Sequence, residues 1–424
     1  MRRIPEAFLR RMERQLGAEF PAFSAALDEP PKKALQINTR KTDRETLAKL
    51  LNLSLPPLAE NPDGAAVPFD FNPNATPLHA AGLFYMQEAT AQAPVAALML
   101  PDEPVVLDLC AAPGGKSAQL AAKMRGGVLV ANEIVPSRAE TLAGNLERMG
   151  VTNAIVTNAE PHPLCERLRE RCDAVLVDAP CAGEAMFRKD EQAVRDWSEE
   201  HVLTCAVRQR AILDDAANAV KPGGQLLYAT CSFSPQENEE TAQWFLDRHP
   251  GFSLVSTRRL YPHTSAGEGQ FYALFRCSGE RAPSVFSHGK SDRIPAFDAF
   301  RDLVRLPEGT LRLLKDGRVL LVPPAPFALD GVRILRAGLL LGEVKGARFE
   351  PAHALALAGG TTPFRNVCAL GFDEAMRYLH GETLQKEAEK GFGAATYEGY
   401  ALGLYKASDG MLKNRLPKGL RLMK

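Results

Sequence analysis

The sequence predicts an α/β protein built around a doubly wound, mostly parallel sheet, with a smaller region on either side of it. Two observations indicate this fold. From about Pro94 onward, short apolar runs alternate with segments of helical period, as they do where helices join parallel strands. The first run also leads into a Gly-rich turn that opens a helix, and the second ends in a carboxylate. This order is typical of a Rossmann-like core that binds a nucleoside.

The apolar runs of the core predict six strands. They are Val105–Leu109, Gly127–Asn132, Ala154–Thr157, Asp173–Val177, Gln225–Ala229 and Gln270–Phe275. Segments of helical period such as Ser117–Met124 and Val202–Val220 separate these runs. Because crossover connections between parallel strands are right-handed, the carboxyl ends of the strands meet at one edge of the sheet, where ligands bind.

The chain length predicts several domains, since 424 residues exceed the size at which one core usually stops growing. Residues 1–94 join a basic amphipathic helix, Ile4 to Leu16, to a Pro-rich segment, and we interpret them as a small accessory α/β domain. The catalytic core spans 95–280, and the polar, Pro- and Gly-broken residues 281–300 form a linker. Residues 301–424 form a mixed α/β module with strands at Arg318–Val322, Gly338–Lys345 and Gly399–Tyr405 and a helix at Phe372–Leu379.

Composition narrows the functional classes. The chain has 51 basic and 51 acidic residues and an isoelectric point near 7.1, so affinity for RNA depends on local basic patches. The charged N-terminus is unlike a signal peptide and no stretch is apolar enough to span a bilayer, which predicts a cytoplasmic protein without a membrane partner. Eight scattered cysteines form no C-x-x-C pair or Cys/His cluster, so we expect no metal. We expect a monomer.

The Gly-rich turn runs Cys110, Ala111, Ala112, Pro113, Gly114, Gly115, Lys116, Ser117. Its small residues let a ligand approach the backbone, and the helix start offers free N–H groups. Glu133 follows the next strand, where a carboxylate accepts hydrogen bonds from ribose hydroxyls. Together these features predict a site for an adenosine nucleoside.

A P-loop NTPase is the main alternative for this turn, because Gly115-Lys116-Ser117 ends like a Walker A motif and Ala174–Asp178 resembles a Walker B strand. However, Cys110 stands where Walker A requires its first glycine. A nicotinamide-binding loop fits no better, since G-x-G-x-x-G does not occur.

Two cysteines follow strands of the predicted sheet. Cys181 ends the segment Asp178-Ala179-Pro180-Cys181, and Cys231 lies in Thr230-Cys231-Ser232. Adjacent strands lie about 4.8 Å apart, so both thiols face one small reactant if these strands are neighbours. Alternatively each cysteine is a small apolar plug, although that leaves the flanking Asp and Pro unexplained.

Three motifs in this order, CAAPGGK (Cys110–Lys116), DAPC (Asp178–Cys181) and TCS followed by Glu237-Asn238-Glu239, resemble the Nol1/Nop2/Sun family of RNA cytosine-5 methyltransferases. The resemblance spans nearly the whole chain. Further segments resemble the bacterial branch that methylates 16S ribosomal RNA, in which the C-terminal part is a PUA-like RNA-binding module. They are Gly183–Lys189, Gly267–Gly269, Arg348–Pro351 and Lys413–Arg421.

The resemblance implies S-adenosylmethionine as cofactor and RNA, most specifically 16S rRNA of the small ribosomal subunit, as substrate. It assigns cofactor binding to Cys110, Ala111, Ala112, Pro113, Gly114, Gly115, Lys116, Glu133, Asn158 and Asp178. It makes Cys231 the nucleophile that adds to cytosine C6, Cys181 the residue that assists release, and Asp178 the partner of the base. Such a thiolate needs a nearby helix terminus or cation, for which Lys189 is one candidate.

The resemblance also marks three departures. Ala182 and Ala185 replace a usual Ser and Gly, and Asn158 stands where many relatives carry Asp. A non-catalytic RNA-binding factor of ribosome assembly is the alternative from another class. Loss of either cysteine or of Asp178 would favour it, and all three residues are present.

Two basic segments are candidates for gripping RNA phosphates, or are merely solvated faces. They are the first helix, with Arg2, Arg3, Arg10, Arg11 and Arg14, and the last fourteen residues, with Lys413, Arg415, Lys418, Arg421 and Lys424.

Overall fold

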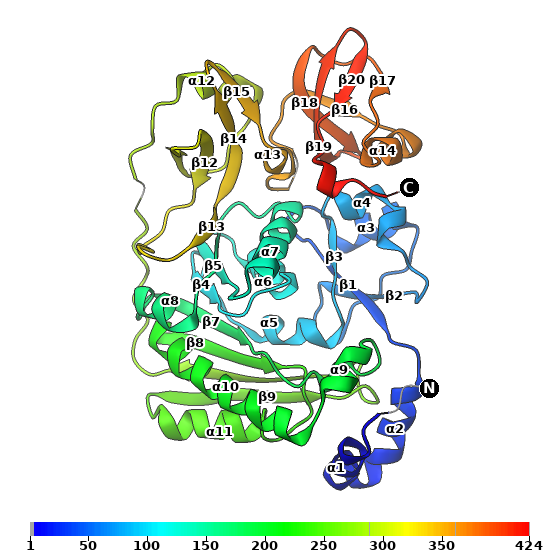
Figure 1. Cartoon of the computed structure of the whole chain (residues 1–424), viewed down its shortest axis with the longest axis vertical. Helices are drawn as coiled ribbons and strands as arrows, with labels where there is room; N and C mark the ends of the chain where they lie inside the picture. The colour runs from blue at the N-terminus through cyan, green and yellow to red at the C-terminus, as the bar shows by residue number, and fades with distance from the viewer. Residues whose placement is uncertain (1–3, 288, 361, 424) are drawn as a thin grey trace.

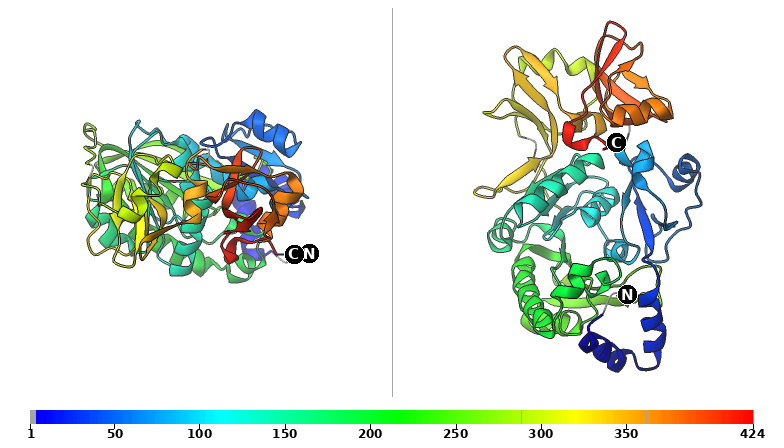
Figure 2. Two further views of the ribbon diagram at one scale, coloured as in Figure 1. Left: turned by 90° about the horizontal axis from the view of Figure 1, so that it is seen from above. Right: turned by 45° about the vertical axis from the view of Figure 1, so that its right-hand side comes forward.

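The computed structural model describes residues 4–287, 289–360 and 362–423, which hold four β-sheets (Figure 1). The helical start of the chain lies at one end of the molecule and the C-terminal sheets lie at the other, with the largest sheet between them (Figures 1 and 2). The mixed α/β fold predicted from the sequence is confirmed.

The central sheet has eight strands in the order β13-β6-β5-β4-β7-β8-β10-β9. Five neighbouring strands, β6 to β8 in this order, are parallel, whereas β10 runs antiparallel between β8 and β9. The strands are β4 (Val105–Asp108), β5 (Val128–Asn132), β6 (Ala154–Thr157), β7 (Cys172–Asp178), β8 (Val220–Thr230), β9 (Phe252–Leu260), β10 (Gln270–Cys277) and β13 (Ile334–Ala337). The predicted strands therefore form one sheet.

Helices cover both faces of this sheet, and alternation along each strand explains why. In β4, Val106 packs on one side with α6 and α7, while Val105 and Leu107 pack on the other side with α10 and α11. The covering helices are α5 (Ala93–Ala97), α6 (Gly115–Lys123), α7 (Pro136–Arg148), α8 (Pro161–Arg167), α10 (Glu199–Ala219) and α11 (Glu239–Arg248), whereas α9 (Glu191–Asp196) packs in a separate cluster with the N-terminal helices. Because both faces of the sheet are buried, its strands appear in the sequence as continuous apolar runs.

Two edge strands of this sheet were not predicted, for different reasons. Strand β9 is mostly exposed and rich in polar residues, so it lacks an apolar run. Strand β13 is four residues long and comes from the C-terminal region, yet it pairs antiparallel with β6. Arg336 of β13 anchors this junction by donating to the carbonyl oxygens of Gly338 (2.8 Å) and Ala143 (3.3 Å).

The N-terminal region has two parts that pack against different neighbours. Helices α1 (Glu6–Leu16) and α2 (Phe20–Asp28) share an apolar cluster with the segments that follow Cys181 and Cys231. The three-stranded sheet β2-β1-β3 shares a cluster with the last sheet of the chain. The elements of this part are β1 (Lys33–Ile37), α3 (Arg44–Leu51), β2 (Gly64–Val67), α4 (Pro77–Ala80) and β3 (Phe84–Met86).

The described residues after 294 build two further sheets, with strand orders β11-β12-β14-β15 and β16-β18-β19-β20-β17. The strands are β11 (Thr310–Leu313), β12 (Arg318–Val322), β14 (Leu339–Lys345), β15 (Arg348–Pro351), β16 (Val367–Ala369), β17 (Leu384–Gln385), β18 (Gly391–Tyr397), β19 (Tyr400–Ser408) and β20 (Met411–Asn414). The helices are α12 (Pro295–Asp298), α13 (His353–Leu357) and α14 (Phe372–Leu379). The strands and helix predicted for this region are all present.

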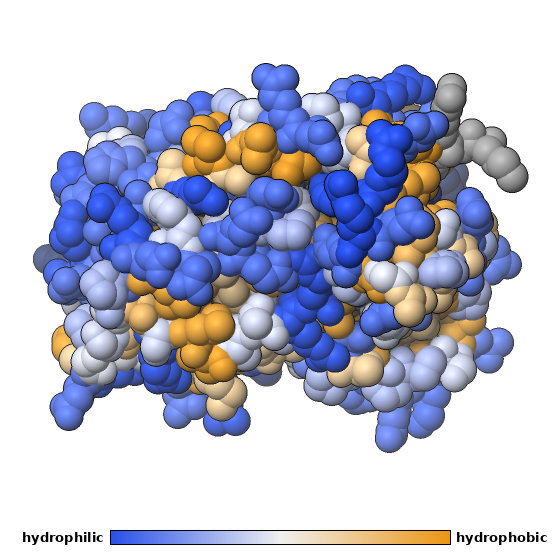
Figure 3. Space-filling view, turned by 90° about the horizontal axis from the view of Figure 1, so that it is seen from below, coloured by the Kyte–Doolittle hydropathy of each residue, from blue (hydrophilic) through white to orange (hydrophobic). Residues whose placement is uncertain are grey.

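The surface is mixed in character. Seen from below, it is mainly hydrophilic, with hydrophobic side chains in separate patches (Figure 3). Within the part of the chain that the structure describes, we find no helix with the length and apolar character needed to cross a membrane.

Candidate active site

A cavity of about 780 Å³ opens at the carboxyl ends of β4, β5, β7 and β8. Its volume lies within the range of small-molecule sites. The lining includes residues of the predicted nucleoside site and of the predicted catalytic site. These residues are Cys110, Ala112, Lys116, Glu133, Asp178, Cys181 and Cys231. The geometry thus joins the Gly-rich turn to the two cysteines.

The Gly-rich turn is shaped by Gly114, whose φ of 113° is strained for other residues, and by the side chains behind it. Asn145 of α7 donates to the carbonyl oxygen of Pro113 at 2.9 Å. Ser117 donates to Asp108 at 2.6 Å, and burial raises the pKa of this carboxyl to about 7. The turn is therefore held by these two side-chain hydrogen bonds.

Glu133 lies at the end of β5 with little exposure, facing the cavity. It accepts a hydrogen bond from the backbone N–H of Val135 at 2.9 Å, and Arg138 lies 3.5 Å from its other oxygen. The carboxylate is thereby held at the place where the second strand of such folds meets a ribose.

The remaining predicted cofactor residues do not line the cavity. Ala111, Pro113, Gly114, Gly115 and Asn158 are absent from the described residues that line it. Asn158 donates to the carbonyl oxygens of Glu133 and Ile134, at 2.8 Å each, and accepts from Arg333. In this structure its amide therefore shapes the loop that carries Glu133.

Strands β7 and β8 are neighbours, and their ends bring the two cysteines together. The Sγ atoms of Cys181 and Cys231 lie 3.2 Å apart. The hydrogen bond to Cys231 and burial both hold the pKa of the Cys181 thiol well above its ordinary value. Cys181 therefore keeps its proton and can donate it toward the sulfur of Cys231.

Lys116 lies beside this pair, where it makes a 2.8 Å ion pair with Asp178. Burial alone would lower the pKa of Lys116, but Asp178 and Cys231 together raise it above its ordinary value. A protonated lysine thus faces the thiols. Lys189, considered from the sequence for this task, lies 3.5 Å from Glu268 instead.

Several cavity residues carried no usable signal in the sequence. Glu88 precedes a short helical turn, and Arg208 and Asp215 lie on α10, where charged residues are ordinary. Glu184 and Glu237 do not line the cavity; they lie in motifs that marked the resemblance, although the sequence assigned them no role. No group of three or more His, Cys, Asp or Glu side chains suited to a metal ion occurs among the described residues.

The basic segments are in part committed to contacts within the protein. Arg11 is paired with buried Glu184, so its predicted contact with phosphate is replaced by an internal one. Arg421 donates to the carbonyl oxygen of Leu416, whereas Lys413 and Lys418 are exposed. Arg2, Arg3 and Lys424 lie outside the described residues.

The fold and the cavity define an S-adenosylmethionine-dependent methyltransferase. Residues 95–276 match the family described as 16S rRNA methyltransferase RsmB/F. Residues 4–89 match the N-terminal domain of 16S rRNA methyltransferase RsmF, 299–358 its first C-terminal domain, and 365–422 its PUA domain. The chain belongs to the RsmB/F family, and the resemblance predicted from the three motifs is confirmed.

Curated relatives match over almost the full length. The ribosomal RNA small subunit methyltransferase F of Cronobacter sakazakii is 34% identical, and the alignment covers 98% of this chain and 96% of that protein. The protein of the same description from Vibrio campbellii is 32% identical over 98% of this chain and 97% of its own.

Solved structures support the fold of about two thirds of the chain. A methyltransferase homolog from Pyrococcus horikoshii has a TM-score of 0.56 and 30% identity, covering 62% of this chain and 91% of its own. NSun6 from the same organism, solved with the S-adenosylmethionine analogue SFG, has a TM-score of 0.58 at 19% identity, covering 66% of this chain and 100% of its own. The latter likeness shows the fold alone.

Proposed function

We propose that this enzyme methylates carbon 5 of a cytosine in RNA, with 16S rRNA as substrate, and that Cys231 is its covalent nucleophile. One observation carries the proposal: two thiols 3.2 Å apart lie beside the Lys116–Asp178 ion pair, in the cavity that holds the cofactor residues. Carbon 5 of cytosine is a poor nucleophile, and a thiolate is the group that activates it.

The attack begins at Cys231. Its thiolate forms a bond to C6, and the electron pair of the C5–C6 bond becomes available at C5. Lys116 and the hydrogen bond from Cys181 stabilise the thiolate before attack. Asp178, at the end of β7, is placed to contact N3 and the exocyclic amine of the base as charge develops there.

S-adenosylmethionine, when bound, supplies an electrophilic methyl group to C5. The described residues suited to holding it are Cys110, Ala112, Glu133 and Arg138, which line one end of the cavity. Glu133 is buried and accepts one backbone hydrogen bond, which leaves further acceptor capacity for ribose hydroxyls.

Release requires removal of the C5 proton, after which the C6–S bond breaks and the double bond is restored. Cys181 keeps its own proton and is hydrogen-bonded to Cys231, so we assign to it the positioning of a water that removes the C5 proton and passes it to solvent. The thiol of Cys231 leaves as thiolate, which returns the pair to its starting state.

The two flanking regions serve RNA binding in this proposal. Residues 1–94 and the region 301–424, which includes the PUA domain, hold the RNA around the catalytic core at 95–280. Exposed Lys413 and Lys418 contact phosphates. The setting is the cytoplasm, where 16S rRNA is made.

The test uses two cysteine variants and a third as control. Cys231→Ala loses methyl transfer and forms no covalent adduct with the RNA. Cys181→Ala attacks and methylates once but fails to release, leaving a band that survives denaturing electrophoresis and disappears after ribonuclease. Cys277→Ala, at the far end of antiparallel β10, keeps wild-type turnover. A stable adduct in Cys231→Ala, and none in Cys181→Ala, would reverse the two roles.

A further inference from the structure

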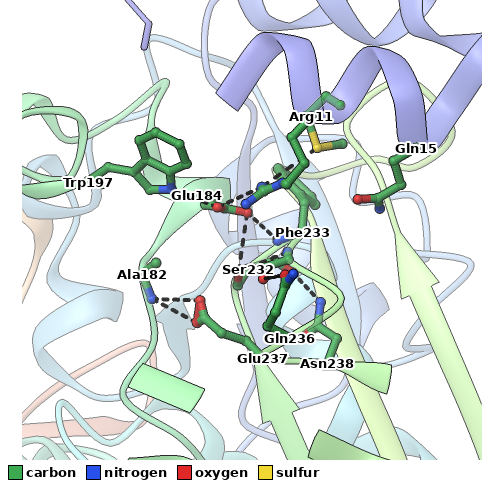
Figure 4. A network of polar contacts seen from close by, with 12 residues as sticks. Arg11, Gln15, Ala182, Glu184, Trp197, Ser232, Phe233, Gln236, Glu237 and Asn238 are labelled. Carbon is green, nitrogen blue, oxygen red and sulfur yellow. Dashed lines mark hydrogen bonds and ion pairs between the residues drawn. The ribbon is translucent and has the colours of Figure 1, made fainter. Parts of the chain in front are cut away.

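Two buried glutamates follow the two cysteines in sequence, and each belongs to the loop of one cysteine while binding the loop of the other (Figure 4). Glu184 follows Cys181 by three residues, and Glu237 follows Cys231 by six. Both are 0% exposed. A carboxylate without solvent requires donors, so the identity of those donors shows what each one holds.

Glu237 holds the Cys181 loop. Its two oxygens lie 3.2 and 3.0 Å from the backbone N–H of Ala182, and it accepts from Gln209 at 3.2 Å. The same Gln209 amide donates to the carbonyl oxygen of Pro180 at 3.0 Å. The residues on both sides of Cys181 are therefore fixed by one carboxylate and one amide.

Glu184 holds the Cys231 loop. One oxygen accepts from the backbone N–H of Phe233 at 2.8 Å and from the hydroxyl of Ser232 at 3.2 Å. Ala185, next to Glu184, donates its N–H to the carbonyl oxygen of Cys231 at 2.9 Å. Backbone groups make two of these three contacts.

The second oxygen of Glu184 ties this loop to the N-terminal helix. It accepts from the indole N–H of Trp197 and from the guanidinium of Arg11, both at 2.7 Å. Arg11 lies on α1, 173 residues away in sequence. Its positive charge compensates the buried carboxylate of Glu184.

Among the described residues, the hydrogen-bond donors to Glu237 are neutral, namely the backbone N–H of Ala182 and the amide of Gln209. Burial, the largest cause, together with the charge of Glu184, raises the pKa of Glu237 to about 7. The charge of Glu184 is therefore compensated by Arg11, whereas that of Glu237 is not. A substitution of Glu237 consequently loosens the contact between the two loops without breaking an ion pair.

We propose that Glu184 and Glu237 are positioning residues that lock the two cysteine loops to each other and so set the contact between the thiols. This rests on the proposed roles of Cys181 and Cys231. Because each loop carries the carboxylate that holds the other, displacement of either loop breaks contacts in both. Neither glutamate touches the reacting atoms.

The experiment measures the distance between the thiols separately from the reaction. Phenylarsine oxide bridges two thiols that lie close together, and the rate of bridging between Cys181 and Cys231 is followed by mass spectrometry of the joined peptides. The full-length chain is used, with melting temperature and S-adenosylmethionine affinity measured in parallel. Methyl transfer to a 16S rRNA transcript gives kcat and KM.

Glu237→Ala is expected to lower both the bridging rate and kcat about 10- to 100-fold, because a misplacement of about 1 Å costs a reaction on that order. KM for S-adenosylmethionine should stay within about twofold, since the cofactor contacts lie at the other end of the cavity. Glu237→Gln restores most of the loss because its amide oxygen still accepts from Ala182. Glu239→Ala, an exposed neighbour paired with Arg259, is the matched control and behaves as wild type.

A folded Glu237→Ala with wild-type bridging and wild-type kcat overturns the proposal. Should that variant not fold, Gln209→Met decides: it keeps a long side chain on α10 but loses the contact with Pro180, and unchanged bridging there has the same meaning. Failure of the wild type to methylate cytosine would instead contradict the proposed function, while the bridging rates still test the positioning.

Discussion

The two parts of the N-terminal region differ in what they pack against. Helices α1 and α2 place Phe8, Met12 and Phe23 in one cluster with Phe187 and Phe233, which belong to the loops of the two cysteines. The rings of Phe8 and Phe187 lie 5.0 Å apart, edge to face. This part therefore packs against the loops of the two cysteines.

The sheet β2-β1-β3 packs on the PUA domain instead. Leu35, Ile37 and Leu47 share a core with Tyr378 and Tyr405. Polar contacts here end on uncharged groups, as where Lys41 donates to the carbonyl oxygen of Ala81 at 2.7 Å. Residues 4–89 therefore extend from a helical end beside the cysteine loops, where Arg11 pairs with Glu184, to a sheet end beside the PUA domain (Figures 1 and 2).

The largest expected effects come from substitutions that disrupt the core of either the helical end or the sheet end of the N-terminal region. Phe8→Ala and Leu47→Ala both remove fully buried side chains, and each should lower the free energy of unfolding by about 3–5 kcal/mol. At a temperature where both variants are folded, Phe8→Ala should also lower kcat, because Phe8 supports the cysteine loops. Leu47→Ala should leave kcat unchanged and weaken RNA binding.

Thermal unfolding and steady-state kinetics on the same preparations check this difference. Equal kcat values in the two folded variants would show that the helical end supports stability alone. A loss of kcat in Leu47→Ala with unchanged affinity for RNA would contradict the separation of the two ends.

A smaller effect on the free energy of unfolding is expected from the protonation of Lys41, which lies at the sheet end of the N-terminal region. Burial, together with the charges of Arg148 and Arg40, lowers the pKa of Lys41 from 10.5 to about 7 in the folded chain. Between these values the unfolded chain binds a proton that the folded chain has released. The free energy of unfolding should therefore rise with pH, by about 1 kcal/mol per unit from pH 7 to 9, and the cost of burial is complete below pH 7.

Lys41→Met should flatten that slope, whereas Lys49→Met, an exposed lysine on α3, should keep it. Denaturant titrations at several pH values measure the slopes. A Lys41→Met slope equal to that of the wild type would mean that the carbonyl contacts keep this lysine charged.

The sequence predicted the central sheet well because its strands are buried on both faces. Burial on both sides selects apolar runs such as Val105–Leu109, and the strand ends then place Cys181 and Cys231 at one edge. Strand β9 was not predicted because its exposed residues form no apolar run. Strand β13 was not predicted because it is short and joins a sheet formed by distant residues.

The residues around the thiols were predicted only in part. Cys231, Cys181, Asp178 and Lys116 were found because their motifs occur in order. The Arg11–Glu184 pair could not be, since it joins residues 173 positions apart and a basic helix equally suggests contact with phosphates. The departures Ala182 and Ala185 keep the loop because it is held through backbone N–H groups, which any residue but proline offers.

The smallest effect on stability is expected at the C-terminal tail, which the proposed function assigns to RNA binding. Deleting the tail would not isolate its charges, because β20 pairs with β19 and β17, and Leu412 and Leu416 are buried in the core shared with the N-terminal sheet.

Lys413→Gln and Lys418→Gln are better variants, since both side chains are exposed and their removal should change the free energy of unfolding by less than about 0.5 kcal/mol. Each lost phosphate contact should reduce the slope of log affinity against log salt by about 0.7–0.9, which titration of a 16S rRNA fragment at several salt concentrations measures. Lys315→Gln, in the turn between β11 and β12, serves as control. A slope unchanged in both tail variants would assign these lysines to the solvated surface and leave RNA binding to other parts of the PUA domain.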